Sequence, residues 1–111
     1  MSISPSSDSL RIVLCTCPTG EAKSLARSLV EQRLAACVNI LPAIQSVYRW
    51  QDAVVDEAEA QLVIKTTTQR SEALFSQLAE LHPYEVPEII SLSSDSVLPA
   101  YLEWVHEQTQ P

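Results

Sequence analysis

Two long strands joined by a short polar turn are predicted between Cys37 and Thr68, and this pair constrains the whole fold. From Glu57 to Lys65 the odd positions are mostly polar, whereas the even positions from 58 to 66 are mostly apolar. Because a strand directs successive side chains to opposite faces, this alternation is typical of a strand with one polar and one apolar face. The segment 38–50 is rich in β-branched and aromatic residues, which favours a second strand. The expected turn is 51–53. Pro42 predicts a bulge, a bend or an edge strand, because proline lacks the backbone donor.

This hairpin is too long for the rest of the chain to cover. Ten strand residues span about 33 Å, roughly twice the length of a typical strand. Tyr48 and Trp50 lie toward its far end, where they would present two large apolar side chains to water. A second copy of the chain would bury them, so the hairpin predicts a homo-oligomer.

The length and the charge restrict the class of protein. The chain has 111 residues, which fits one domain, and a net charge of −7 from 14 acidic and 7 basic residues. A protein that neutralises phosphates needs a basic face, so we expect neither nucleic-acid binding nor electrostatic binding to a membrane. No apolar run is long enough to cross a bilayer. Residues 1–9 are expected to form a flexible tail without signal-peptide character, ahead of a single domain over residues 10–108.

The cysteine and glycine contents add two expectations. Three cysteines without an export signal indicate free thiols in a reducing compartment, hence a cytoplasmic protein. The single glycine, Gly20, excludes glycine-rich phosphate loops and dinucleotide-binding motifs. We therefore expect no organic cofactor.

The remaining elements follow from periodicity and turn signals. An apolar run over 10–17 predicts a central strand, and Thr19 is the expected N-cap of an amphipathic helix whose stripe reaches Leu34. A second helix is expected after Thr68, with Thr67 or Thr68 as its N-cap, and it should end near Leu81 because Pro83 follows. A short strand over 89–92 and a last helix capped by 94–96 complete the chain.

This order of elements predicts an α+β fold of the ferredoxin-like, split βαβ type, with a long β-hairpin and an extra C-terminal helix. Two helices should cover one face of an antiparallel sheet. The other face then lacks helices of its own except for the last, which again favours an oligomer.

Three groups of residues are candidates for chemistry. Cys15 and Cys17 lie two apart on one strand, so both thiols share a face, near the start of the strand that carries Cys37. Thiolates with a nearby imidazole suit copper(I) or zinc, although the spacing alone favours small buried residues in the core. The segment His82–Glu88 combines an imidazole, a phenol and carboxylates between two prolines, as a functional loop or as a helix stop.

The third group consists of hairpin carboxylates, which suit a hard cation, although a solvated strand face is the commoner explanation. They are Asp52, Asp56, Glu57 and Glu59. His82 and His106 are the two histidines, and no Ser or Cys lies in a nucleophile motif. We therefore expect a protein that is not an enzyme.

Several motifs, spread over residues 11–105, make the chain resemble the CutA family of divalent-cation tolerance proteins. The matching segments are 13–16, 34–40, 46–50, 57–59, 64–66, 82–89 and 101–104, including the run His82-Pro83-Tyr84-Glu85-Val86-Pro87-Glu88-Ile89. The resemblance implies a ferredoxin-like fold assembled as a homotrimer, similar to PII-type signalling proteins, in which hairpin strands pair between subunits.

The resemblance also implies metal ligands. Copper binding in the family is associated with the cysteine of the first strand and a His-His pair before Pro-Tyr, which correspond here to Cys15 and to Leu81 with His82. Leu81 replaces the first histidine of the pair, so one implied ligand is missing. The turn also departs from the family, since Asp52-Ala53 stands where Gly-Lys is usual.

The leading expectation is a non-enzymatic homotrimer that binds copper or another divalent ion through Cys15 and His82 and contributes to metal tolerance. The alternative is a PII-like signalling trimer that binds a metabolite or protein partner in a cleft between subunits. The residues expected at that cleft are Trp50, Lys65, Tyr84, Glu85 and Glu88. A third possibility is a structural trimer that anchors partners.

Overall fold

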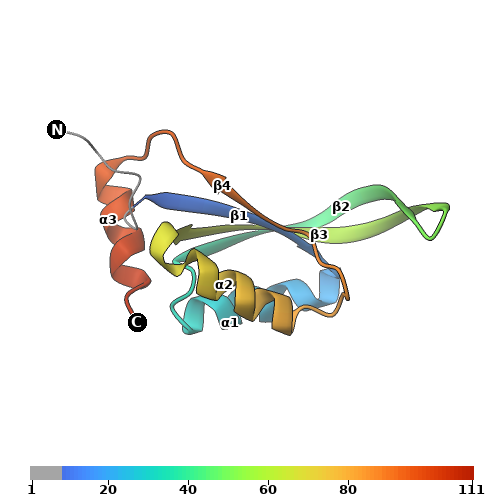
Figure 1. Cartoon of the computed structure of the whole chain (residues 1–111), viewed down its shortest axis with the longest axis horizontal. Coiled ribbons are helices and arrows are strands. Elements are labelled where there is room, and N and C mark those ends of the chain that lie inside the picture. The colour runs from blue at the N-terminus through green and yellow to red at the C-terminus, as the bar shows by residue number, and fades with distance from the viewer. Residues whose placement is uncertain (1–8) are drawn as a thin grey trace.

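One antiparallel sheet in the strand order β2-β3-β1-β4 forms the centre of the computed structural model, which describes residues 9–111. Figure 1 shows α1 and α2 together on one face of this sheet and α3 at one end. The elements are β1 (Leu10–Cys17), a 3₁₀ turn (Thr19–Glu21), α1 (Ala22–Glu31), β2 (Cys37–Trp50), β3 (Ala53–Thr67), α2 (Thr68–Leu81), β4 (Ile89–Ser93) and α3 (Pro99–Gln108). The ferredoxin-like α+β fold with a long hairpin and an added C-terminal helix is thereby confirmed.

The main core lies between the sheet and the first two helices. The alternation in β3 directs Leu62 and Ile64 inward, where they are fully buried beside Cys15 and Cys17 of β1. From the helices, the apolar stripes contribute Leu25, Leu29, Leu74 and Leu78. As predicted, β1 is central, because it pairs with β3 on one side and β4 on the other.

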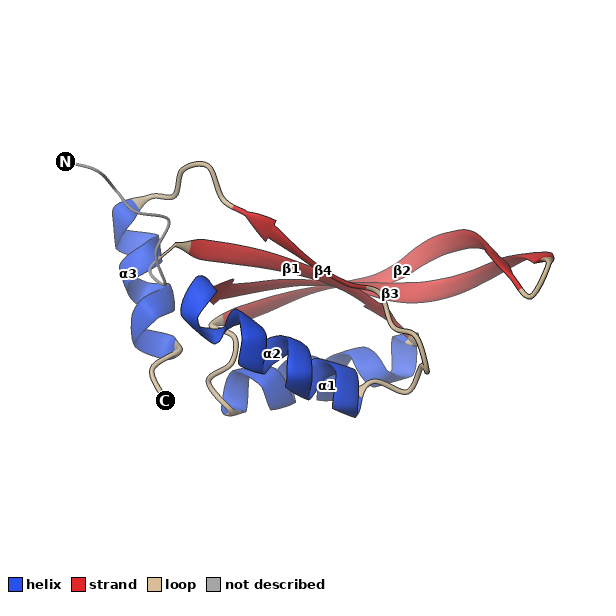
Figure 2. Cartoon of the chain, in the orientation of Figure 1, coloured by secondary structure: helices blue, strands red, loops and turns tan. Residues whose placement is uncertain are grey.

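The hairpin extends well beyond the helices (Figure 2), as the length of the two strands requires. At about 3.3 Å per residue, the 14 residues of β2 span about 46 Å. The register shifts between Leu41 and Ile44, which confirms the bulge predicted at Pro42. The turn itself is shorter than expected: Gln51 and Asp52 have φ of 49° and 65°, and Ala53 already pairs with Trp50. Two positive φ values are typical of the type I′ turns that close two-residue hairpins.

Two predicted helix caps are wrong, and one is confirmed. Thr19 lies in the 3₁₀ turn and donates its hydroxyl to the Pro42 carbonyl (3.4 Å), so α1 starts at Ala22 without a side-chain cap. Ser94 donates to the Leu10 carbonyl (2.8 Å), and α3 begins only at Pro99. In both cases a tertiary hydrogen bond takes the hydroxyl that the sequence pattern assigns to a cap. Thr67 does cap α2 by accepting from the Arg70 amide.

One of the two predicted helix ends is confirmed and the other is wrong. α2 ends at Leu81, as Pro83 predicts. α1 ends at Glu31, three residues before the end of its apolar stripe, because the chain turns at Arg33, whose φ is 59°. The Leu34 amide then donates to the Leu29 carbonyl (3.0 Å) and the Arg33 amide to the Val30 carbonyl (3.0 Å), the pattern of a Schellman motif.

The face of the sheet opposite α1 and α2, which we call the open face, carries a patch of apolar residues. Residues paired across the ladders share a face, which places Leu14 beside Val63 and Ile90, and Ile12 beside Leu92. α3 covers only one end of this face, where Val105 is buried with Leu10 and Ala36. Ile90 and Leu92 remain 47% and 44% exposed.

The ends of the domain contribute two further observations. Of the expected tail over residues 1–9, residues 1–8 lie outside the described part, and the Ser9 carbonyl accepts from the Thr68 amide (3.0 Å). None of the helices in residues 9–111 is long and apolar enough to cross a membrane.

Candidate functional site

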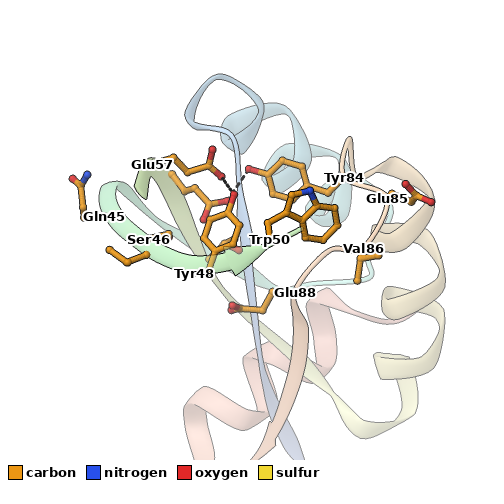
Figure 3. A pocket seen from close by; sticks show the side chains of 12 residues that line it. Gln45, Ser46, Tyr48, Trp50, Glu57, Tyr84, Glu85, Val86 and Glu88 are labelled. Atoms are coloured by element: carbon orange, nitrogen blue, oxygen red, sulfur yellow. Dashed lines mark hydrogen bonds between the residues drawn. The ribbon is translucent and has the colours of Figure 1, made fainter. Parts of the chain in front are cut away.

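A pocket of about 720 Å³ opens where the hairpin leaves the body of the sheet. Figure 3 shows its two walls: Tyr48 and Trp50 come from the hairpin, and Tyr84, Val86 and Glu88 come from the loop before β4. The lining residues are Thr16, Gln45, Ser46, Val47, Tyr48, Trp50, Glu57, Glu59, Tyr84, Glu85, Val86 and Glu88. We call it the acidic–aromatic pocket, because its side chains include four carboxylates and three aromatic rings.

Two tyrosine–glutamate pairs fix the polar part of the pocket. The Tyr48 hydroxyl donates to Glu57 Oε1 (2.6 Å), and the Tyr84 hydroxyl donates to Glu59 Oε2 (2.7 Å). The hydrogen bond to Glu57 raises the pKa of Tyr48 to about 12, and burial together with Glu59 raises the pKa of Tyr84. Both phenols therefore stay protonated at neutral pH and act as donors. Each phenol thereby uses its proton on a carboxylate of β3.

The structure brings together four of the five residues predicted at the cleft. Trp50, Tyr84, Glu85 and Glu88 line the pocket. Lys65 does not line it, because Lys65 pairs with Ile12 and Cys37 at the opposite end of β3. Its Nζ lies 3.9 Å from the Cys37 sulfur. The pocket of this chain consequently has no basic side chain among its lining residues.

The most buried carboxylate of the pocket was expected on a solvated strand face. Glu59 is only 5% exposed, because Tyr84 folds over it from the loop. Glu57 also lines the pocket, whereas Asp52 and Asp56 do not. The alternation in β3 places Glu57 and Glu59 on the same face, and this was the only feature of the sequence that could have assigned both to one site. Their partners, 9 and 25 residues away, had no signal in the sequence.

His82 links the core to this pocket. Its Nε2 lies 2.7 Å from the Thr16 carbonyl, and its Nδ1 accepts from the Tyr84 amide at 3.1 Å. These partners fit the neutral ring with the proton on Nε2. The ring centroids of His82 and Tyr84 are 4.8 Å apart. His82 is therefore a positioning residue that holds Tyr84 in the wall of the pocket.

Cys15 and His82 approach the same carbonyl group, but their arrangement does not fit a metal ion. The Cys15 sulfur lies 3.6 Å from the Thr16 oxygen, and its side chain is fully buried. Burial, reinforced by Cys17, raises the pKa of Cys15 to about 12, whereas a metal ligand must be a thiolate. Both nitrogens of His82 already have partners. Within residues 9–111, no group of three or more His, Cys, Asp or Glu side chains is placed to hold a metal.

The thiols should differ sharply in reactivity. Cys15 and Cys17 are fully buried and burial raises the pKa of both, whereas Cys37 is partly exposed. We expect a thiol-specific colorimetric reagent at pH 8 to modify at most one cysteine per native chain and all three after unfolding in guanidinium. The Cys37→Ser variant should then give no signal until it unfolds. Rapid labelling of this variant in its native state would contradict the burial of Cys15 and Cys17.

The split βαβ sheet, the extended hairpin and the pocket at its base define a ferredoxin-like α+β protein with a built-in ligand-sized cavity. The family model of the CutA1 divalent ion tolerance proteins matches residues 11–108. The chain belongs to the CutA1 family.

Individual relatives agree with this assignment. The divalent-cation tolerance protein CutA of Thermus thermophilus is 48% identical over 99 residues, which cover 88% of this chain and 96% of the relative. The CutA protein of Mus musculus is 42% identical over 92% of this chain, and this chain spans 58% of that longer relative.

Solved structures confirm the fold. CutA of Xylella fastidiosa superposes with a TM-score of 0.89 at 39% identity, covering 92% of this chain and 99% of the other. The PII-like protein CutA of Nostoc in its apo form superposes with a TM-score of 0.86 at 37% identity, covering 90% and 97%.

Proposed function

We propose that this chain is a non-catalytic, cytoplasmic ligand-binding protein that works as a homotrimer, with the acidic–aromatic pocket as its ligand site. The observation that carries this proposal is the pocket itself: about 720 Å³, within the usual range of small-molecule sites, with aromatic surface and converging polar groups. Membership of a family that includes a PII-like protein supports the same function.

The trimer is supported by the apolar patch on the open face. Ile90 and Leu92 are nearly half exposed in the single chain, and Ile12, Leu14 and Val63 continue the patch across the sheet. A contiguous apolar surface of this kind is typical of a subunit interface. Closed rotational symmetry would let every subunit bury the same patch.

The ligand-binding function is tested by a thermal melting screen of the intact protein against metabolites, nucleotides and metal ions. A ligand that binds only the folded state raises the melting temperature by mass action. We expect at least one compound to raise it, and the Trp50→Ala variant to lose that shift because Trp50 is in the pocket wall. A screen without any reproducible shift would refute the ligand-binding function.

The second candidate function is the binding of copper or another divalent ion through Cys15 and His82. The family description as divalent ion tolerance proteins and the approach of both side chains to the Thr16 carbonyl support it. An ion could bind there only after Cys15 loses its proton and His82 gives up at least one hydrogen bond. This candidate therefore requires a local rearrangement that the pocket does not.

Copper(I) titration of the reduced protein against a calibrated competing chelator tests this candidate. If these ligands are used, the Cys15→Ser/His82→Ala variant should lose the tightly held copper. The Cys37→Ser/His106→Ala variant, which also lacks one thiol and one imidazole, should retain it. Equal retention in both variants, with circular dichroism showing that both are folded, would remove Cys15 and His82 as ligands.

A further inference from the structure

We propose that the acidic–aromatic pocket selects an organic ammonium cation: an alkylated or aliphatic amine that carries positive charge on an apolar skeleton. This inference rests on the proposed ligand-binding function and adds the chemical class of the ligand. Three properties of the pocket lead to it, namely its charge, the use of both tyrosine hydroxyls as donors to its own carboxylates, and its aromatic surface.

The charge that one chain contributes to the pocket disfavours an anionic ligand. Glu57, Glu59, Glu85 and Glu88 line it, and none of the described lining residues is Lys, Arg or His. An anion in this space would meet four carboxylates without a single basic partner, whereas a cation would be attracted by all of them. Lys65, which would have supplied a positive group, lies at the other end of β3.

The hydrogen bonds of the pocket favour a ligand that brings its own hydrogen-bond donor or positive charge. Both tyrosine hydroxyls are used as donors to Glu57 and Glu59, and the Gln45 amide donates to Asp56 (2.7 Å). Glu59 as a residue is 5% exposed, and Tyr84 donates to its Oε2. Among residues 9–111 the one fully buried side-chain oxygen or nitrogen without a partner is Ser91 Oγ, so Glu59 Oε1 is not sealed away from solvent. An N–H group of a ligand would supply a donor to these carboxylates, and a quaternary ammonium would supply the charge alone.

The aromatic surface of the pocket favours an organic cation over a bare metal ion. Tyr48 and Trp50 are 38% and 47% exposed and reach the pocket from the hairpin, opposite Tyr84 from the loop. Aromatic faces attract ammonium groups and also bury their alkyl carbons. The carboxylates surround a volume of about 720 Å³ and do not converge as metal ligands.

The test uses the Trp104→Phe protein, so that Trp50 is the one remaining tryptophan of the two in the chain. Choline, spermidine and magnesium chloride are titrated in phosphate buffer at about 150 mM salt, where distant surface charges are screened. The neutral carbon isostere of choline, 3,3-dimethyl-1-butanol, is titrated alongside. We expect saturable changes in Trp50 fluorescence with choline or spermidine, and binding of the neutral isostere at least about tenfold weaker, as loss of a desolvated cation–π and charge contact predicts.

Three variants separate the pocket from the overall negative charge. Glu59→Gln removes one charge inside the pocket and should weaken binding about tenfold. Glu72→Gln removes one charge on the exposed surface of α2 and should leave affinity within about twofold, since screened surface charges contribute little. Tyr48→Ala should also weaken binding, and because Tyr48 is well exposed it tests the site even if Glu59→Gln fails to fold.

Each outcome has a distinct meaning. Equal binding of choline and its neutral isostere, or a response to magnesium alone, would overturn the ammonium class while leaving the pocket as a ligand site. Equal weakening by Glu59→Gln and Glu72→Gln would show that the cations bind by overall charge, which also overturns the inference. No response of Trp50 to these cations, with a hit of another class in the melting screen, would reject the inference and retain the proposed function.

Discussion

Replacing Ile90 with lysine is expected to convert the proposed homotrimer into monomers. Ile90 lies on the open face beside Leu14, and in the single chain it is 47% exposed, so a lysine there costs the isolated chain little. In a trimer that buries this patch, each subunit would lose roughly 1.5–3 kcal/mol of apolar burial and would also have to bury an ammonium group. Because every subunit carries the change, the cost is multiplied by three.

Light scattering coupled to size-exclusion chromatography measures this directly. The parent protein should elute at three times the 12.3 kDa mass of the chain, and Ile90→Lys at the mass of one chain. Val30→Lys is the matched control, since Val30 is 41% exposed on α1, which covers the other face of the sheet. The open-face interface is refuted if the parent protein is a monomer, or if both variants remain trimers.

Replacing Leu62 with alanine is expected to lower the free energy of unfolding by about 2–5 kcal/mol. Leu62 is fully buried in the middle of β3, opposite Cys15, and packs in the cluster formed with α1 and α2. The substitution removes three carbon atoms from a core whose helices cannot collapse fully into the cavity.

Denaturant titration at one fixed protein concentration is the appropriate measurement, because the stability of an oligomer depends on concentration. Val47→Ala provides the control on the same hairpin: Val47 is 65% exposed, and its truncation should change the free energy by no more than about 0.5 kcal/mol. Similar losses for the two variants would mean that the cluster around Leu62 does not dominate the stability of the chain.

The sequence by itself determined the order and the faces of the elements. The alternation from 57 to 66 placed Leu62 and Ile64 inward, Pro42 produced the bulge, and Pro83 ended α2. These features depend on the local backbone and on a periodic pattern, both of which act over a few residues. The family resemblance agreed with them, and the family match over residues 11–108 confirmed it.

Only the tertiary structure decided the chemistry of the pocket. In the sequence, Glu59 cannot be told apart from a solvated carboxylate on a strand. In the structure, the Tyr84 hydroxyl, 25 residues later in the chain, donates to one of its oxygens. Similarly, Lys65 lies on the same strand face as Glu59, but the extended strand carries it to the far end of the sheet. His82 was predicted as a metal ligand, and the fold gives both of its nitrogens hydrogen-bond partners. The physical reason is that burial and hydrogen bonding depend on which distant segments the packed sheet brings together, and no local pattern encodes those partners.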